Sequence, residues 1–555
     1  MKSYQVREQL HEDLLPHLLL SRGIELPEHE TFLAPDFERD SHDPMLLPDM
    51  ASAVERILAA AKNGEQVAVW SDYDCDGIPG GVLLSEFLRT LGLRITHYIP
   101  HRHKEGYGLN VEGLQELKTQ GVSLVITVDL GTTDIEPIAQ AKSFGVEVIV
   151  TDHHLVSGLL PEALVINPKR PESRYPFADL CGAGVAWKLV QGILLKNRPE
   201  GFAEGREKWL LDLAGLGTLS DMVPLRGENR LLAYYGLTVM RRGRRPGLAA
   251  LLKLLRIRPS TLTEDDVGFM VAPRINAASR MDSPAVAARL LAATDGEEAA
   301  ALAAQLNSIN DERKGLVAAT VKEANKRFAL GGGEAQPVIV MGSVDWRPGI
   351  LGLVANKLVE AHGKPVCLWG REGGEVVRGS CRGDGEINIV ELMAQARDLF
   401  EDFGGHHGSG GFSLAQERVH ELPGRLAQAY ELLRAQAQTQ SAVGVDRELD
   451  LEEVSRTQQS LRRLSPFGTG FEKPLFIFPG LQITAVRTFG KQQNHLGLSL
   501  APRSLGGVGR VDGIAFFSTP DSFNKKVVAG ERADIVGHVE LDWRGQPRVR
   551  VVDVI

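Results

Sequence analysis

Short apolar runs alternate with longer amphipathic stretches through residues 46–300. The stretches between the runs, such as 81–92 and 134–145, have the spacing of helices that cover one face of a sheet. The runs are rich in valine, isoleucine and leucine and have the length of buried strands; they lie at 66–70, 93–99, 124–128, 146–150 and 163–167. This alternation predicts an α/β fold with a parallel sheet.

Three further patterns follow along the chain. Residues 296–330 are rich in alanine, glutamate and lysine and are long enough for one helix that connects two lobes. A second α/β unit is expected up to about residue 435, and short β runs separated by turns predict a small barrel, such as an OB-fold, after it. The expected domains are an N-terminal helical arm (1–45), a first α/β domain (46–300), a connecting helix (301–330), a second α/β domain (331–435) and a barrel (446–555).

The composition fits a multidomain enzyme. With 555 residues and 43% hydrophobic content, the chain can bury several cores. The first residues mix charges with apolar positions, and no apolar run reaches the roughly 20 residues of a membrane span, so we expect a cytoplasmic protein without a membrane partner. Four scattered cysteines without CxxC spacing argue against a zinc site. The net charge of −9 does not favour a protein that merely coats nucleic acid, although a local basic groove can coexist with it.

Acidic residues follow the predicted strands of the first domain. Asp72, Asp74 and Asp76 come after the first strand, Asp129 after the third, and Asp152, His153 and His154 after the fourth, while Asp221 follows an apolar helical stretch. The carboxyl ends of parallel strands meet at one edge of a sheet, so these side chains should converge. In an extended chain the carboxylates of 72, 74 and 76 would also point to one side.

A single acidic trio at a strand end is as well explained by a helix N-cap or a solvated turn. Four such motifs at one edge instead favour a metal site, because so many carboxylates repel one another without cations. Oxygen-rich ligation with one imidazole suits Mn²⁺ or Mg²⁺ better than zinc. Two such ions would be suited to phosphoryl hydrolysis.

These motifs resemble a known family. DYDCDG, VDLG, TDHH and GTLSDMVPL are similar, in order and spacing, to the signature motifs of the DHH phosphoesterases. EGYGLN, CGAGVAWKL, APRINAASRM, GSCRG, FGGHHGSGGFSL and PFGTGFEKPLF extend the resemblance to the family's single-strand-specific 5′→3′ exonucleases, from about residue 50 to the C-terminus. The resemblance implies a DHH catalytic domain, a DHHA1 domain that closes over it, and an OB-fold that grips single strands.

The resemblance also implies roles for individual residues. One ion would be held by Asp74 and Asp129, and the other by Asp76, Asp129, His153 and Asp221. Asp72 would be a further ligand or a neighbour of the ligands, His154 would contact the scissile phosphate, and Asp152 would orient its neighbouring imidazole. The implied phosphate-binding residues, which would hold the 5′ end, are Arg102, Arg280, Ser380, Arg382 and His406.

Several features leave alternatives open. For Arg102, a surface ion pair explains the residue equally well. The glycine-rich segment 404–411 could present N–H groups to phosphate, but is more often a tight turn. Three aromatic residues could stack on bases, but core or turn packing is the favoured interpretation for Tyr107, Phe467 and Phe516.

The chain also departs from the family's usual motifs. The affected positions are Pro79, Gly80, Ser279, Arg347, Gly383 and Ser409 of GGHHGSGG. None of them is a proposed metal ligand. The departures therefore bear on rate, end preference and the choice between DNA and RNA.

The resemblance thus implies a two-metal exonuclease that releases nucleoside 5′-monophosphates in DNA repair and recombination, with a single-strand-binding protein and a helicase as possible partners. One alternative is a phosphoesterase for short oligonucleotides or small phosphoanhydrides, against which the barrel argues. Another is a non-catalytic scaffold, against which the intact acids argue. A dehydrogenase is disfavoured, because GAGVAW at 182 lacks the third glycine and follows no predicted strand.

Overall fold

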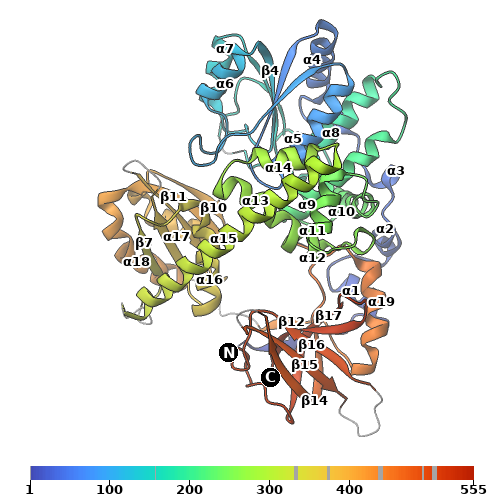
Figure 1. Cartoon of the computed structure of the whole chain (residues 1–555), viewed down its shortest axis with the longest axis vertical. Helices are drawn as coiled ribbons and strands as arrows, with labels where there is room; N and C mark the ends of the chain where they lie inside the picture. The colour runs from blue at the N-terminus through green and yellow to red at the C-terminus, as the bar shows by residue number, and fades with distance from the viewer. Residues whose placement is uncertain are drawn as a thin grey trace. The chain divides into compact units, whose positions relative to one another are not determined.

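The computed structural model describes residues 2–156, 158–330, 336–371, 376–435, 442–490, 493–502 and 509–555 (Figure 1). It divides into two compact units. One consists of Met1–Asp43, Met222–Leu237 and Ser441–Ile555, and the other of Pro44–Asp221 and Thr238–Gln440. Within the described ranges, no helix is both long enough and apolar enough to cross a membrane.

The first sheet of the larger unit confirms the predicted α/β fold. It has five parallel strands in the order β3-β2-β4-β5-β6, with bounds β2 (Gln66–Ser71), β3 (Arg94–Tyr98), β4 (Val122–Val128), β5 (Glu147–Thr151) and β6 (Leu164–Ile166). Its inner strands are buried along nearly their whole length, as continuous apolar runs require. Helices α4 (Met50–Asn63), α5 (Gly77–Thr90), α6 (Val111–Thr119), α7 (Ile135–Ser143) and α8 (Gly182–Lys196) accompany it.

A helical region follows the sheet. Its larger helices are α9 (Leu211–Ser220), α11 (Pro246–Leu254), α13 (Ala272–Met281), α14 (Ala285–Ala292) and α15 (Gly296–Leu330). Helix α10 (Gly227–Met240) lies mostly within the smaller unit, which includes Met222–Leu237. The 35-residue helix α15 has the bounds that its composition predicts. It packs against α11, α13 and α14 and also against α16 (Pro348–His362), so it does connect the two lobes of this unit.

The second sheet has the order β10-β11-β9-β8-β7. The strands β7 (Ile339–Ser343), β8 (Val366–Gly370) and β9 (Val376–Arg382) and the helix α16 lie where the sequence predicts them. The glycine-rich segment is different: β10 (Asp402–His406) and β11 (Ser409–Ala415) pair as an antiparallel hairpin around a two-residue turn. The prediction missed both strands because glycine is depleted in strands.

The smaller unit contains the predicted barrel. Strands β14 (Phe476–Phe489), β15 (His495–Ala501), β16 (Val511–Ala515), β17 (Arg532–Leu541) and β18 (Pro547–Val554) pair in the order β14-β15-β16-β18-β17, and β14–β17 pairing closes the barrel. The N-terminal segment is not purely helical: β1 (Tyr4–Val6) pairs with β12 (Val443–Val445). Arg22 Nη1 also lies 2.9 Å from Asp446 Oδ1, which joins this segment to the start of the barrel region.

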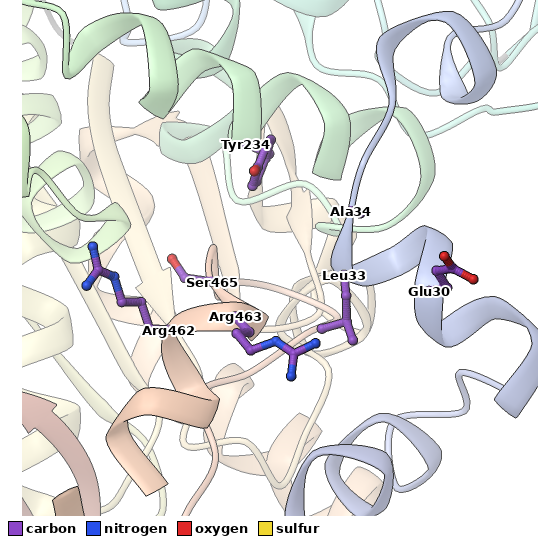
Figure 2. A pocket seen from close by; sticks show the side chains of 7 residues that line it. All are labelled: Glu30, Leu33, Ala34, Tyr234, Arg462, Arg463 and Ser465. Atoms are coloured by element: carbon purple, nitrogen blue, oxygen red, sulfur yellow. The ribbon is translucent and has the colours of Figure 1, made fainter. Parts of the chain in front are cut away.

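The smaller unit also holds a pocket of about 510 Å³ (Figure 2). The lining residues come from α2 (His29–Leu33), α10 and the end of α19 (Val454–Leu464), and are Glu30, Leu33, Ala34, Tyr234, Arg462, Arg463 and Ser465. The Arg463 side chain extends toward Leu33, whereas Arg462 points the other way. None of the residues expected to bind metal or phosphate lines this pocket. All of those residues belong to the larger unit.

Candidate metal centre

The acidic motifs converge at one edge of the first sheet. Strands β2, β4 and β5 are direct neighbours, and Asp72, Asp129 and Asp152 are the first residues beyond their carboxyl ends. Asp129 adopts a left-handed backbone conformation with a φ of 66°. Asp residues tolerate this conformation better than most, and the turn directs the chain away from the sheet. The convergence expected from the order of strands is therefore present.

Three overlapping groups of side chains could each hold a cation. In each group the candidate ligand atoms lie within 4.8 Å of one another; the groups are Asp72–Asp74–Asp129, Asp76–His153–Asp221 and Asp129–His153–His154. His153 Nε2 lies 3.1 Å from Asp129 Oδ1, 3.7 Å from Asp221 Oδ2 and 3.9 Å from Asp76 Oδ2. Asp129 and His153 thus connect the groups, which is the arrangement of a two-ion centre that shares a ligand.

The segment that carries the first acids is folded differently from the expectation. Residues 72–76 form a turn rather than an extended strand, and Asp74 Oδ1 accepts hydrogen bonds from the backbone N–H groups of Asp76 and Gly77. The carboxylates therefore separate into two groups instead of lining one side. The N-cap alternative is also correct in part, since Asp74 satisfies N–H groups at the start of α5 while remaining beside Asp72 and Asp129.

The electrostatics of the cluster favour a bound cation. Burial, reinforced by Asp74, raises the pKa of Asp76 to about 6, and burial with Asp76 and Asp74 raises that of Asp221 to about 9. The pKa values of Asp72 and Asp129 are raised for the same reasons. Among the described residues, Asp72 Oδ1 and Asp129 Oδ1 are buried without a hydrogen-bond partner. Divalent cations would satisfy these oxygens and offset the repulsion, so the residues fit Mn²⁺ or Mg²⁺.

The two histidines have different environments. Burial, with a contribution from His154, lowers the pKa of His153 to about 3, which keeps its imidazole neutral and able to coordinate a metal. Burial alone would lower the pKa of His154, but its 2.7 Å hydrogen bond to Asp152 raises it. Asp152 therefore orients an imidazole, as expected, and that imidazole belongs to His154. Asp152 also accepts the backbone N–H of His153 and of Thr132.

The sequence-based expectations did not include some of the residues that shape this site. The backbone N–H groups of Gly182 and Ala183, at the start of α8, donate to the two oxygens of Asp76 at 2.6 and 2.9 Å. A Cβ on Gly182 would lie 2.5 Å from the Asp129 Cβ, so only glycine fits. GAGVAW is thus the helix start that anchors Asp76, which explains Gly182 without a dinucleotide.

Tyr107 also belongs to the site rather than to the core. Its side chain is 51% exposed, and its hydroxyl donates to the Asp129 carbonyl at 3.2 Å and lies 3.3 Å from His154 Nδ1. Tyr107 is therefore not a core residue, although its ring packs edge-on against Tyr73 and His154. Phe467 is buried, and Phe516, which is 44% exposed, lies in a turn where it packs against His495, so core or turn packing describes both as expected.

The expected phosphate-binding arginines gather into one cationic cluster. Burial and the neighbouring guanidinium groups of Arg102, Arg313 and Arg382 lower the pKa of Arg280 to about 9. Arg280 Nη1 donates to the Gly349 carbonyl, and Arg382 Nη1 donates to Ser380 Oγ at 2.7 Å. Arg102 stacks over the Tyr73 ring at 4.9 Å instead of forming the alternative surface ion pair. Several guanidinium groups held close together form a binding site for an anion, with Asp72 and Asp74 of the metal cluster near Arg102 and Arg280.

Other expected positions have different surroundings or are explained by packing. His406 is exposed at the end of β10 and pairs with Ser409, which in turn pairs with Arg382 of β9, so His406 lies two strands from Arg382 in the same row of the sheet. Gly80 allows α5 to approach β4 and α8 closely, because a Cβ at this position would lie 2.8 Å from Val128 Cγ1 and 2.9 Å from Ala183 Cα. Arg347 precedes α16 and is exposed.

Comparisons with known proteins agree with this geometry. Family models match the DHH family N-terminal domain at residues 66–218, the DHHA1 domain at 335–438 and the RecJ OB domain at 445–552. The chain is 33% identical to the single-stranded-DNA-specific exonuclease RecJ of Bacillus subtilis, covering 100% of this chain and 69% of the relative. It is 31% identical to RecJ of Escherichia coli, covering 97% and 95%.

A solved structure shows the same architecture. The crystal structure of RecJ in complex with Mn²⁺ from Thermus thermophilus matches with a TM-score of 0.78 at 27% identity, covering 97% of this chain and 75% of that one. A Mg²⁺ complex of RecJ from the same organism matches with a TM-score of 0.72 at 25% identity. Together with the extent of the sequence matches, these likenesses establish that the chain belongs to the RecJ family of DHH phosphoesterases.

Proposed function

We propose that this chain is a metal-dependent exonuclease that hydrolyses single-stranded DNA in the 5′→3′ direction and releases nucleoside 5′-monophosphates. The observation that carries the proposal is the buried cluster in which Asp129 and His153 link three groups of candidate ligands. The named relatives are single-stranded-DNA-specific exonucleases, which supports the same substrate here.

In this proposal Asp72, Asp74 and Asp129 hold one ion, and Asp76, Asp129, His153 and Asp221 hold the other. When bound, the ions would neutralise phosphate charge and make a nucleophile available near neutral pH. The neutral imidazole of His153 offers a lone pair. His154, whose protonated form Asp152 stabilises, is placed to donate a hydrogen bond to a phosphate oxygen beside Asp129.

The proposed polarity follows from the cationic cluster of Arg102, Arg280 and Arg382. A terminal phosphate carries more charge than an internal phosphodiester, so a cluster of guanidinium groups would bind it selectively. Arg280 lies in the same helix as Asn276, whose Oδ1 accepts the backbone N–H of Cys75 between two metal-cluster acids. A strand anchored by its 5′-phosphate would therefore present its first linkages to the metal centre.

We further propose a role in DNA repair and recombination in the cytoplasm. A helicase that produces single strands and a single-strand-binding protein that coats them are the partners that this substrate implies. We also propose that the chain is divided into a catalytic domain, a DHHA1 domain and a barrel domain at the boundaries expected from the sequence. The separate matches to the DHH, DHHA1 and RecJ OB models support this division.

Digestion of end-labelled substrates tests the activity and its polarity. We expect 5′-labelled single-stranded DNA to release labelled mononucleotide at once, whereas 3′-labelled DNA should shorten progressively, with Mn²⁺ or Mg²⁺ present. An Arg280→Gln variant should lose the preference for a 5′-phosphate over a 5′-hydroxyl end, while Arg289→Gln, on the exposed surface, should retain it. Release of mononucleotide from the 3′ end first would contradict the polarity, and equal digestion of RNA would contradict the sugar preference.

Replacement of Asp152 tests the positioning of His154. In Asp152→Asn, one carboxylate oxygen becomes an N–H donor that cannot accept the present hydrogen bonds, so activity should fall about 10–100-fold. The lost negative charge should also lower the pKa of His154, which would move the acidic limb of the pH–rate profile. A fall in rate with an unchanged pH profile would show that Asp152 acts only through the fold.

A further inference from the structure

Residues 238–261 form a strongly cationic segment of the chain. The segment holds seven arginine and lysine residues and no acid, although the whole chain has a net charge of −9. It consists of the last residues of α10, the turn before α11, α11 itself, and the turn and short 3-10 helix (Pro259–Thr261) that follow it. Such a local excess of cations creates a positive potential that a balanced, solvated surface does not have.

Two of these cations have structural roles. Arg245 donates to Asp212 Oδ2 and to Glu86 Oε1, each at 2.7 Å, and Arg241 Nε donates to the Leu262 carbonyl at 2.9 Å. The other five are exposed, and no carboxylate of a described residue lies within 4.0 Å of them; they are Arg242, Arg244, Lys253, Arg256 and Arg258.

The two turns lie side by side. A Cβ on Gly243 would lie 3.7 Å from the Pro259 ring, and the Arg241–Leu262 hydrogen bond joins the same segments. The Arg244 guanidinium lies 3.8 Å from the centre of the Trp209 ring, which is 38% exposed. We use the name basic face for Trp209 and the exposed arginines that flank these contacts in sequence: Arg242, Arg244, Arg256 and Arg258.

The basic face is separate from the metal centre. Arg245 anchors it to Asp212, near the start of α9, and to Glu86, in the second half of α5. The metal-cluster acids Asp76 and Asp221 flank the opposite ends of the same two helices. The ten residues of α9 span about 15 Å, so the face lies beyond the reach of the residues that surround the scissile linkage.

We propose that the basic face is a second DNA-binding site, which holds the sugar–phosphate backbone of DNA outside the catalytic cluster. The proposal rests on the proposed function, which supplies a polyanionic substrate longer than the cluster can contact. Guanidinium groups form forked hydrogen bonds with phosphate oxygens. Trp209, braced by Arg244, offers a ring on which a base can stack. A segment made of acidic residues alone could bind the arginines but has no ring or apolar side chain to place on Trp209.

Binding measured in EDTA tests the site without hydrolysis. The variant R242Q/R244Q/R256Q/R258Q should bind labelled DNA at least tenfold more weakly, measured by fluorescence anisotropy at several salt concentrations. The slope of the logarithm of the binding constant against the logarithm of the salt concentration should become shallower by up to about 3. Each phosphate contact on a single strand contributes about 0.7 to this slope. The matched control K62Q/K118Q/K322Q/K326Q removes four exposed cations elsewhere and should keep the parent slope. Equal losses in both variants, or none in the first, would overturn the proposal.

Further measurements separate this inference from the proposed nuclease activity. Hydrolysis of a short oligonucleotide should be unchanged in the first variant, whereas hydrolysis of long DNA should slow. A parent without any nuclease activity would refute the proposed function, while the EDTA titration would still decide the basic face. Should the fourfold variant not fold, R244Q alone and loss of DNA-induced fluorescence quenching in W209F provide the test. Binding of a glutamate-rich peptide that is lost in the variant, with DNA binding unchanged, would refute the DNA assignment.

Discussion

Replacement of Asp129 by Asn is expected to abolish nuclease activity, with a loss of at least about 10³-fold, because several kcal/mol of metal-dependent stabilisation depend on this carboxylate. Asp129 is the acid that lies in two of the three candidate metal groups. Asn retains the size of the side chain and tolerates the positive φ of 66°, so the backbone should stay in place. Isothermal titration with Mn²⁺ should show the loss of at least one bound ion.

The same substitution should have the opposite effect on the metal-free protein. Burial and the surrounding acids raise the pKa of Asp129, so its ionised form is unfavourable in the folded state. Removing that charge should raise the Tm in EDTA by roughly 2 °C or more. Asp134→Asn is the control for activity, since Asp134 lies near the same strand end but accepts the Leu109 N–H outside the cluster. Activity within tenfold of the parent in D129N would refute the role of Asp129 as a shared ligand.

The features that the sequence predicted well are those set by strand order. Apolar runs identify β2, β4 and β5, and the geometry of parallel strands then brings Asp72, Asp129 and Asp152 to one edge without further information. The local backbone conformation was harder to predict from the sequence. The turn at 72–76 arises because Asp74 satisfies the N–H groups at the start of α5, which competes with the extended conformation that alternating acids suggested.

Contacts between distant residues could not be predicted. Tyr107 lies 22 residues from Asp129 in sequence, and only the fold brings its hydroxyl to the Asp129 carbonyl. The β10–β11 hairpin is rich in glycine, and its pairing with β9 rather than its own propensity makes it a strand pair. The anchoring of Asp76 by Gly182 depends likewise on the packing of α5 against α8, for which GAGVAW gives a signal only after the fold is known.

The stability of the metal-free protein should decrease as pH rises, which is the reverse of the usual behaviour of carboxylates. The folded-state pKa values are about 6 for Asp76 and about 9 for Asp221, both above the ordinary value of 3.8. The folded state therefore binds more protons than the unfolded state between about pH 4 and 9. The stabilisation from these protons is complete below about pH 4 and is lost as pH rises through 6 and 9.

Saturating Mn²⁺ should invert this dependence, because the ion competes with protons for the same carboxylates and binds more tightly as pH rises. At a concentration 100 times its Kd, the ion should add about 2.7 kcal/mol to the free energy of unfolding. Thermal melts from pH 5 to 9, with EDTA and with Mn²⁺, would measure both slopes. In Asp221→Asn the EDTA curve should decline less steeply between pH 7 and 9, while Asp72 and Asp129, whose pKa values are also raised, still contribute. Parallel curves with and without the ion would mean that protons and metal do not share these oxygens, and the acids would then need another explanation for their burial.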